Sequence, residues 1–74
     1  MKKQNLAQRL GQSIHARRVA LGYSQDDFAD RIDMHRAYYG IIERGVKNVT
    51  LPTLQRVCVG LGITMSELLR SIDE

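Results

Sequence analysis

The sequence predicts an all-α fold built from five helices, and three observations support this prediction. Apolar residues recur every three to four positions through most of the chain, which is the spacing of one helix face. Three of these runs are preceded by a residue that favours the start of a helix: Ser24, Thr50 and Thr64. Three of them are followed by a glycine, the residue that commonly ends a helix: Gly22, Gly45 and Gly62. The single proline, Pro52, falls in the first turn of a predicted helix, where its missing N–H removes no hydrogen bond. At 74 residues the chain is expected to form one domain, residues 1–74.

The first predicted helix begins at Leu6 and ends at Gly22. Residues 1–5 before it are polar, have nothing to bury and are expected to form a flexible arm. The helix has one apolar face, which carries Leu6, Leu10, Ile14 and Leu21. Arg17 and Arg18 lie on its flank, where an arginine pair most often remains solvated charge.

The next two predicted helices are short and lie within residues 24–44. Ser24 can accept a hydrogen bond from the backbone N–H three residues further on, so a helix begins near Gln25. Its inward residues cover only two turns, so this helix cannot be stable alone: they are Phe28, Ala29 and Ile32. The helical spacing breaks at residues 33–35 and resumes in a helix over about 36–44. Two short helices joined by such a turn are typical of a helix-turn-helix.

The fourth predicted helix begins after Thr50 and closes at Gly62, with an apolar face made of Leu51, Leu54, Val57, Cys58 and Leu61. Cys58 is therefore predicted to be a core thiol. The alternative, a redox-sensing cysteine, needs exposure and cationic neighbours. The run from Thr64 to Glu67 has the pattern of a capping box, which starts a fifth helix through about Ser71.

The composition favours a polyanionic partner and argues against several other classes of protein. The net charge is +3 and the pI is about 9.4. A chain this short buries too little surface to enclose an active site, and no serine or cysteine has an evident histidine partner, so an enzyme is not expected. Cys58, His15 and His35 lack the spacing of a zinc site, and neither metal, other cofactor nor small-molecule ligand is expected. No apolar run approaches the length of a membrane span, and a cytoplasmic protein is expected.

The spaced residues of the predicted helix-turn-helix resemble one family, the phage-repressor type or Xre family of transcriptional regulators: Gln25, Ala29, Met34, Tyr39, Ile42 and Glu43. The resemblance covers about residues 6–70 and implies a five-helix, lambda-repressor-like DNA-binding domain that binds double-stranded operator DNA. The run MHRAYYGIIERGVKNVTLPTLQRV, residues 34–57, is most similar to controller proteins of restriction-modification systems. In related repressors the residues matching Arg18 and Glu43 form an ion pair, so the resemblance implies one here.

Three positions depart from the family pattern. Asp33 stands at the turn where glycine is usual, and it is expected to adopt a left-handed backbone. His35 replaces the usual serine or threonine before the recognition helix, so it is a poor N-cap whose ring is free to reach a phosphate or a base edge. Tyr39 replaces an aliphatic residue, so its hydroxyl must find a partner or the surface.

The N-terminal end of a recognition helix enters the major groove, so the candidates for reading bases lie within residues 35–41. Arg36 is the strongest candidate, because a guanidinium can contact O6 and N7 of guanine together. Ala37 and Ile41 are candidates for thymine methyl contacts, while Tyr38 either contacts DNA or packs against its own domain. A second set is expected to hold phosphates: Gln25, Arg44, Lys47 and Asn48. The alternative for Lys47 is a solvated loop lysine.

The C-terminal segment, residues 63–72, carries more apolar residues than one short helix needs: Ile63, Met65, Leu68, Leu69 and Ile72. Some of these residues are expected to cover the core. The surplus predicts a homodimer interface, since two recognition helices are needed to span two half-sites. Asp73 and Glu74 place negative charge away from the predicted basic face. The alternative function is the antitoxin of a toxin-antitoxin pair, which would add a toxin-binding surface or tail, and the chain has no spare segment for one.

Overall fold

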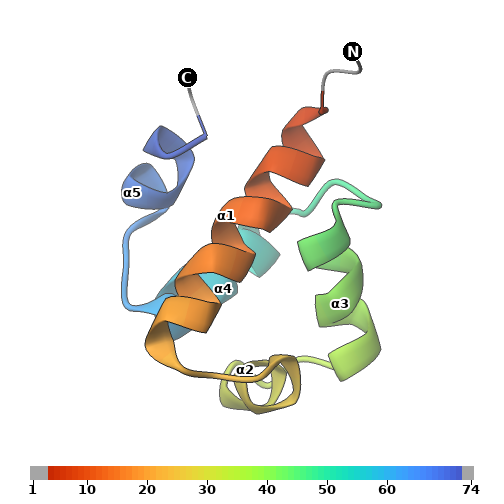
Figure 1. Ribbon diagram of the computed structural model, residues 1–74, viewed down its shortest axis with the longest axis vertical. Helices are drawn as coiled ribbons and strands as arrows, with labels where there is room; N and C mark the ends of the chain where they lie inside the picture. The colour runs from red at the N-terminus through yellow and green to blue at the C-terminus, as the bar shows by residue number, and fades with distance from the viewer. Residues whose placement is uncertain (1–3, 73–74) are drawn as a thin grey trace.

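The computed structural model describes residues 4–72, which fold into five α-helices (Figure 1). They are α1 (Leu6–Leu21), α2 (Gln25–Arg31), α3 (Arg36–Arg44), α4 (Leu51–Leu61) and α5 (Met65–Arg70). The predicted all-α fold class is therefore confirmed. Helix α1 is the longest, and α3 and α5 pack against it on different sides (Figure 1). The acidic residues Asp73 and Glu74 lie outside the described residues, as do residues 1–3 of the predicted arm.

Side-chain caps define the starts of four helices. The predicted caps Ser24, Thr50 and Thr64 each accept a hydrogen bond from a backbone N–H in the first turn of α2, α4 and α5. Asn5 does the same for α1, and together with Gln8 it forms a complete capping box. The prediction that residues 1–5 form an arm is therefore wrong for Asn5, which belongs to the start of α1.

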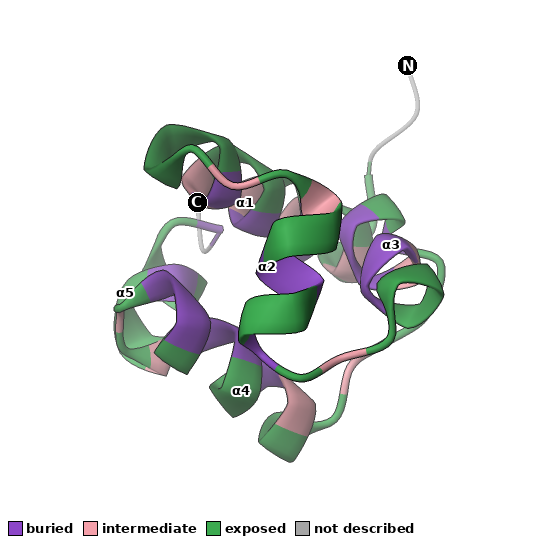
Figure 2. Ribbon diagram, turned by 90° about the horizontal axis from the view of Figure 1, so that it is seen from below, coloured by how far each residue is buried: buried purple, intermediate pink, exposed green. Residues whose placement is uncertain are grey.

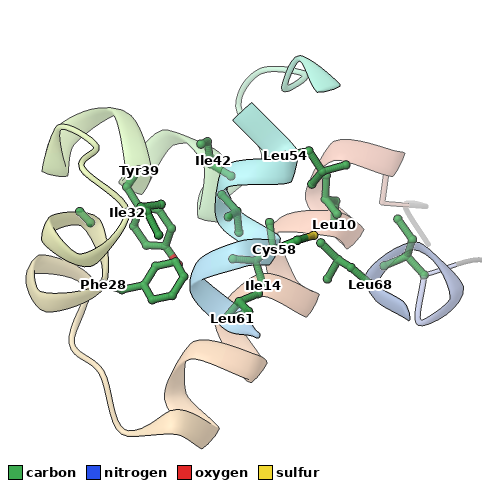
Figure 3. Packing of buried hydrophobic residues seen from close by; sticks show 13 residues of the cluster. Leu10, Ile14, Phe28, Ile32, Tyr39, Ile42, Leu54, Cys58, Leu61 and Leu68 are labelled. Atoms are coloured by element: carbon green, nitrogen blue, oxygen red, sulfur yellow. The ribbon is translucent and has the colours of Figure 1, made fainter. Parts of the chain in front are cut away.

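One hydrophobic core receives side chains from all five helices (Figure 3). A fully buried residue comes from each helix in turn: Ile14, Phe28, Tyr39, Val57 and Leu68. The rings of Phe28 and Tyr39 are tilted, with centroids 5.3 Å apart, which is a favourable aromatic geometry. Cys58 is also buried, as predicted, and burial raises the pKa of its thiol. In Figure 2 the buried stretches of the ribbons lie toward the centre of the molecule.

Helix ends account for the apolar residues whose burial was predicted wrongly. Leu6, Leu21 and Leu51 are more than half exposed, because each stands at a terminus that extends beyond the core. Conversely, Leu68 and Ile72 are buried within the protomer, so two residues assigned to the dimer surface complete the core instead.

Within residues 4–72, no helix is both long and apolar enough to cross a membrane.

Candidate nucleic-acid interface

The turn between α2 and α3 is closed by its own backbone. Asp33 adopts the expected left-handed conformation, with φ of 56°. The Asp33 N–H donates to the carbonyl of Asp30 at 3.1 Å, and the Met34 N–H donates to the carbonyl of Ala29 at 2.8 Å. The small, buried side chain of Ala29 lets the two helices approach each other. The result is a helix-turn-helix over residues 25–44.

Two glycines bring the C-terminal end of α3 into backbone contact with α1. A Cβ atom on Gly11 would stand 2.3 Å from the carbonyl oxygen of Glu43 and 2.6 Å from that of Ile42. Gly45 ends α3 with φ of 68°, and a Cβ atom there would stand 2.4 Å from the Cα of Gln8. Neither position accepts a larger residue unless the backbone moves, so these contacts fix where α3 docks on α1.

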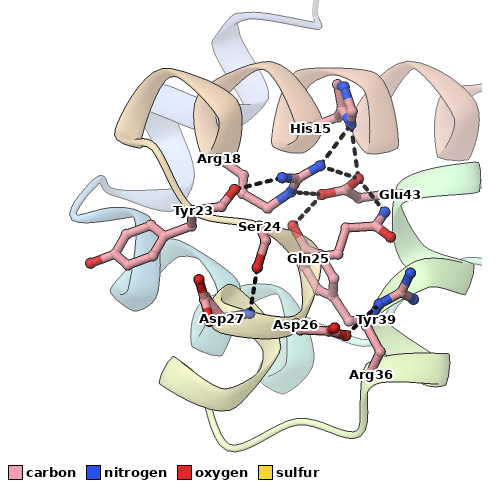
Figure 4. Close-up of polar contacts among 10 residues, drawn as sticks. All are labelled: His15, Arg18, Tyr23, Ser24, Gln25, Asp26, Asp27, Arg36, Tyr39 and Glu43. Atoms are coloured by element: carbon pink, nitrogen blue, oxygen red, sulfur yellow. Dashed lines mark hydrogen bonds and ion pairs between the residues drawn. The ribbon is translucent and has the colours of Figure 1, made fainter.

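The carboxylate of Glu43 is the centre of a polar network that joins α1, α2 and α3 (Figure 4). Its Oε2 accepts from Arg18 Nε at 2.7 Å and from the hydroxyl of Tyr39. Its Oε1 accepts from Arg18 Nη2 at 3.2 Å and from Gln25 Nε2 at 2.8 Å, and it lies 2.9 Å from His15 Nδ1. Arg18 also donates to the carbonyl of Tyr23 at 2.6 Å. The ion pair that the resemblance implied is thus present, and the Tyr39 hydroxyl has found its partner.

Burial and hydrogen bonding act in opposite directions on the ionisation of Glu43 and in the same direction on that of Tyr39. Burial of the Glu43 carboxyl opposes its ionisation, but hydrogen bonds from Arg18, Tyr39, His15 and Gln25 outweigh that effect and lower its pKa from 4.5 to about 2. Burial, together with the bond to Glu43, raises the pKa of Tyr39 far above its ordinary value. The bond to Glu43 also raises the pKa of Arg18. At neutral pH the network therefore holds a carboxylate, a guanidinium and a neutral phenol.

The two sides of α3 have different roles. The inner side packs against the core and α1 through Tyr39, Ile42 and Glu43. The outer side, together with the residue before the helix, presents exposed side chains that we call the outer face of α3: His35, Arg36, Ala37, Tyr38 and Arg44. Ile41 was predicted to be exposed, but its side chain is only partly exposed.

Most of the predicted DNA contacts lie on this outer face or beside it. His35 precedes α3, makes no side-chain cap hydrogen bond and is exposed, and Tyr38 is 40% exposed. Lys47 and Asn48 are exposed in the loop that follows α3. Gln25 differs, because it is half-buried and its amide nitrogen donates to Glu43. The Gln25 side chain therefore makes a hydrogen bond within the domain, which its position in the sequence did not predict.

Arg36, the strongest candidate for base reading, is paired with an acidic residue of the preceding helix. Its Nε lies 3.0 Å from Oδ1 of Asp26, and the side chains are 46% and 81% exposed (Figure 4). The pair is therefore a surface contact, unlike the Arg18 and Glu43 pair, in which the side chains are 8% and 4% exposed.

Three contributors to this site were not predicted from the sequence. His15 and Asp26 are common polar residues on exposed helix faces, and nothing in their spacing indicates a partner in another helix. Gly11 did carry a signal, because a glycine inside an amphipathic helix lowers helix stability and often marks a close approach of backbones.

A family model described as helix-turn-helix matches residues 14–68. The control protein C.MunI of Mycoplasma sp is 49% identical over 51 residues, which are 69% of each chain. The control protein C.BamHI of Bacillus amyloliquefaciens is 33% identical over 66 residues, which are 88% of this chain and 82% of that protein. The chain therefore belongs to the helix-turn-helix family and, within it, to the control proteins.

Two solved structures extend the comparison to the fold. The restriction-modification controller protein C.AhdI from Aeromonas hydrophila is 34% identical, with a TM-score of 0.80 over 84% of this chain and 94% of that chain. The restriction-modification controller protein C.Esp1396I, a tetramer in complex with its natural 35 base-pair operator, is 25% identical, with a TM-score of 0.81 over 97% of this chain and all of that one. The family resemblance inferred from the sequence is confirmed, and the expectation that the chain is not an enzyme agrees with these control proteins.

Proposed function

We propose that the chain is the controller of a restriction-modification operon, a transcriptional regulator that binds operator DNA as a homodimer. The observation that carries this proposal is the division of α3 into two sides. The inner side is fixed to α1 and α2 by Glu43 and by the backbone contact at Gly11, while the outer face is exposed and carries Arg36 and Arg44. A rigid helix with one free, cationic side is what insertion into a major groove requires.

In this proposal the outer face divides into reading and holding residues. Arg36, Ala37 and Tyr38 occupy the first turn of α3, which is the end that enters the groove, so they read bases together with His35. Arg44, Lys47 and Asn48 follow along the helix and its loop, where they hold phosphates. The controller relative of the same fold, solved in complex with its operator, supports DNA binding by this chain.

The proposed dimer surface is smaller than the sequence suggested and lies at α5. Leu69 is 40% exposed, whereas Ile63 and Met65 are only partly exposed and pack against the core. A groove of about 540 Å³ separates α5 from the start of α1, and Leu6 and Leu69 are among the residues that line it. These exposed apolar side chains support pairing with a second copy, which would place two recognition helices on two half-sites.

A DNA-binding titration tests the proposed function directly. The purified chain, with no companion protein, is titrated against the fragment upstream of its own gene and against random DNA of the same length. We expect tight, salt-dependent binding to the upstream fragment, weaker by about 10³-fold or more on random DNA, and a footprint with two-fold symmetry. Equal affinity for both DNAs would contradict the proposal, and a requirement for a companion chain would favour an antitoxin.

A further inference from the structure

The side chain of Arg36 does not extend outward from α3 in the free protein. Its Nη1 lies 2.7 Å from the place where a Cβ atom on Gly40 would stand, one turn further along the same helix. Nη1 of Arg44 lies 3.2 Å from that same place. The two guanidinium groups therefore lie together over Gly40, and the Arg36 side chain runs along α3 toward the C-terminal end of that helix.

Asp26 stabilises this conformation. Its carboxylate is 3.0 Å from Arg36 Nε, and it supplies negative charge beside two like-charged guanidinium groups. Paired recognition of guanine requires two adjacent N–H donors directed outward into the groove. With Nε paired with the Asp26 carboxylate and Nη1 packed over Gly40, Arg36 must turn outward before it can read a base.

We propose that Asp26 is a specificity-determining residue, which holds Arg36 away from DNA in the free protein and competes with DNA for this side chain. Arg36 leaves Asp26 only for a contact that is stronger than the ion pair. A bidentate guanine contact meets that condition, because the discrimination it provides exceeds the contribution of an exposed ion pair. Asp26 therefore restrains Arg36 from binding phosphates on random DNA. The inference rests on the proposed function, because it assumes that Arg36 faces DNA.

The experiment uses Asp26→Asn in the full chain, with a matched control on the same helix. Asp27 is the same residue type in the same turn of α2, and no salt bridge to its side chain occurs in the part of the chain that the structure describes. Asp27→Asn therefore controls for net charge and for the loss of an acid at the start of a helix. Binding is measured by fluorescence anisotropy on the upstream fragment and on random DNA, over a series of salt concentrations, after circular dichroism has shown that each variant is folded.

We expect Asp26→Asn to bind the upstream fragment about two- to fivefold more tightly per half-site than Asp27→Asn does, which is the range expected when an exposed ion pair no longer has to be broken. On random DNA, the slope of log affinity against log salt should become steeper by about one per protomer, because the released Arg36 gains a phosphate contact. Both differences should disappear when the same variants are made in an Arg36→Ala background.

Three results would overturn the inference. Equal effects of Asp26→Asn with and without Arg36 would show that Asp26 acts only through its charge. Equal effects of Asp26→Asn and Asp27→Asn would show that the position of Asp26 beside Arg36 has no importance. Weaker binding by Asp26→Asn would show that Asp26 orients Arg36 for reading. In all three cases a wild-type chain that still prefers the upstream fragment leaves the proposed function intact, whereas the loss of that preference in wild type refutes the proposed function itself.

Discussion

Removing the Glu43 carboxylate should cost a large part of the stability of the domain. Glu43→Ala leaves the guanidinium of Arg18 buried without its partner, and it also removes the acceptor of Tyr39 and Gln25. Breaking a buried ion pair in this way costs about 3–5 kcal/mol. A domain of this size has a total free energy of unfolding of about 4–11 kcal/mol, so the melting temperature should fall by more than about 10 °C.

The pH dependence of stability depends on the same carboxylate. The pKa of Glu43 is lowered from 4.5 to about 2 by folding, and each unit corresponds to about 1.4 kcal/mol, so the carboxylate contributes about 3 kcal/mol. Because the folded pKa is the lower one, this contribution is fully present above pH 5 and is lost as the pH falls toward 2. Glu43→Gln should therefore remove much of the acid sensitivity that wild type shows between these values.

Urea denaturation at pH 7, 5 and 3 measures both effects. Asp30→Asn is the control, because Asp30 is an exposed acidic residue of α2 outside the Glu43 network. A change of less than about 0.5 kcal/mol for Glu43→Ala, or an unchanged acid dependence for Glu43→Gln, would refute the reasoning, since the pair would then behave as a surface contact.

Two further predictions concern association and packing. If the chain pairs through α5 as proposed, Leu69→Glu should give a folded monomer, because it places a charge in the exposed apolar surface of that helix. Sedimentation measures this, and a wild-type monomer at high micromolar concentration would contradict the proposed dimer. Gly11→Ala should destabilise the domain by about 1–3 kcal/mol, because the added methyl would stand 2.3 Å from a backbone oxygen of α3; a higher melting temperature, as expected from helix propensity alone, would show that α1 and α3 separate easily.

Local chemistry made the helices of this chain predictable. Ser24 and Gly45 are a start signal and a stop signal that act within one turn, so the bounds of α2 and α3 could be predicted from nearby residues. The burial of Phe28 and Ile32 followed from their spacing in the same way. The exposure of Leu6 could not be predicted from spacing, because spacing identifies the apolar face of a helix but not how far along the helix the core extends.

The contacts between helices were much less predictable. Arg18 and Glu43 are 25 positions apart, and only the resemblance to a family linked them. His15 and Gln25 joined the network without any sequence signal, because their polar side chains fit a solvated surface equally well. In α5 the pattern of apolar residues could not show that Leu68 is buried while Leu69 is partly exposed, since a helix of six residues is too short to define its buried face by spacing.

The central claim, that the outer face of α3 reads DNA sequence, is tested most directly by comparing Arg36→Ala with Lys47→Ala. Affinity for the upstream fragment and for random DNA is measured across a range of salt concentrations. Arg36→Ala should lose about 1–3 kcal/mol of binding free energy per half-site on the upstream fragment and should change binding to random DNA little. Lys47→Ala should weaken both DNAs alike and lower the salt slope by about one per protomer. Equal losses on both DNAs for Arg36→Ala, with a shallower salt slope, would contradict the claim and make Arg36 a phosphate contact.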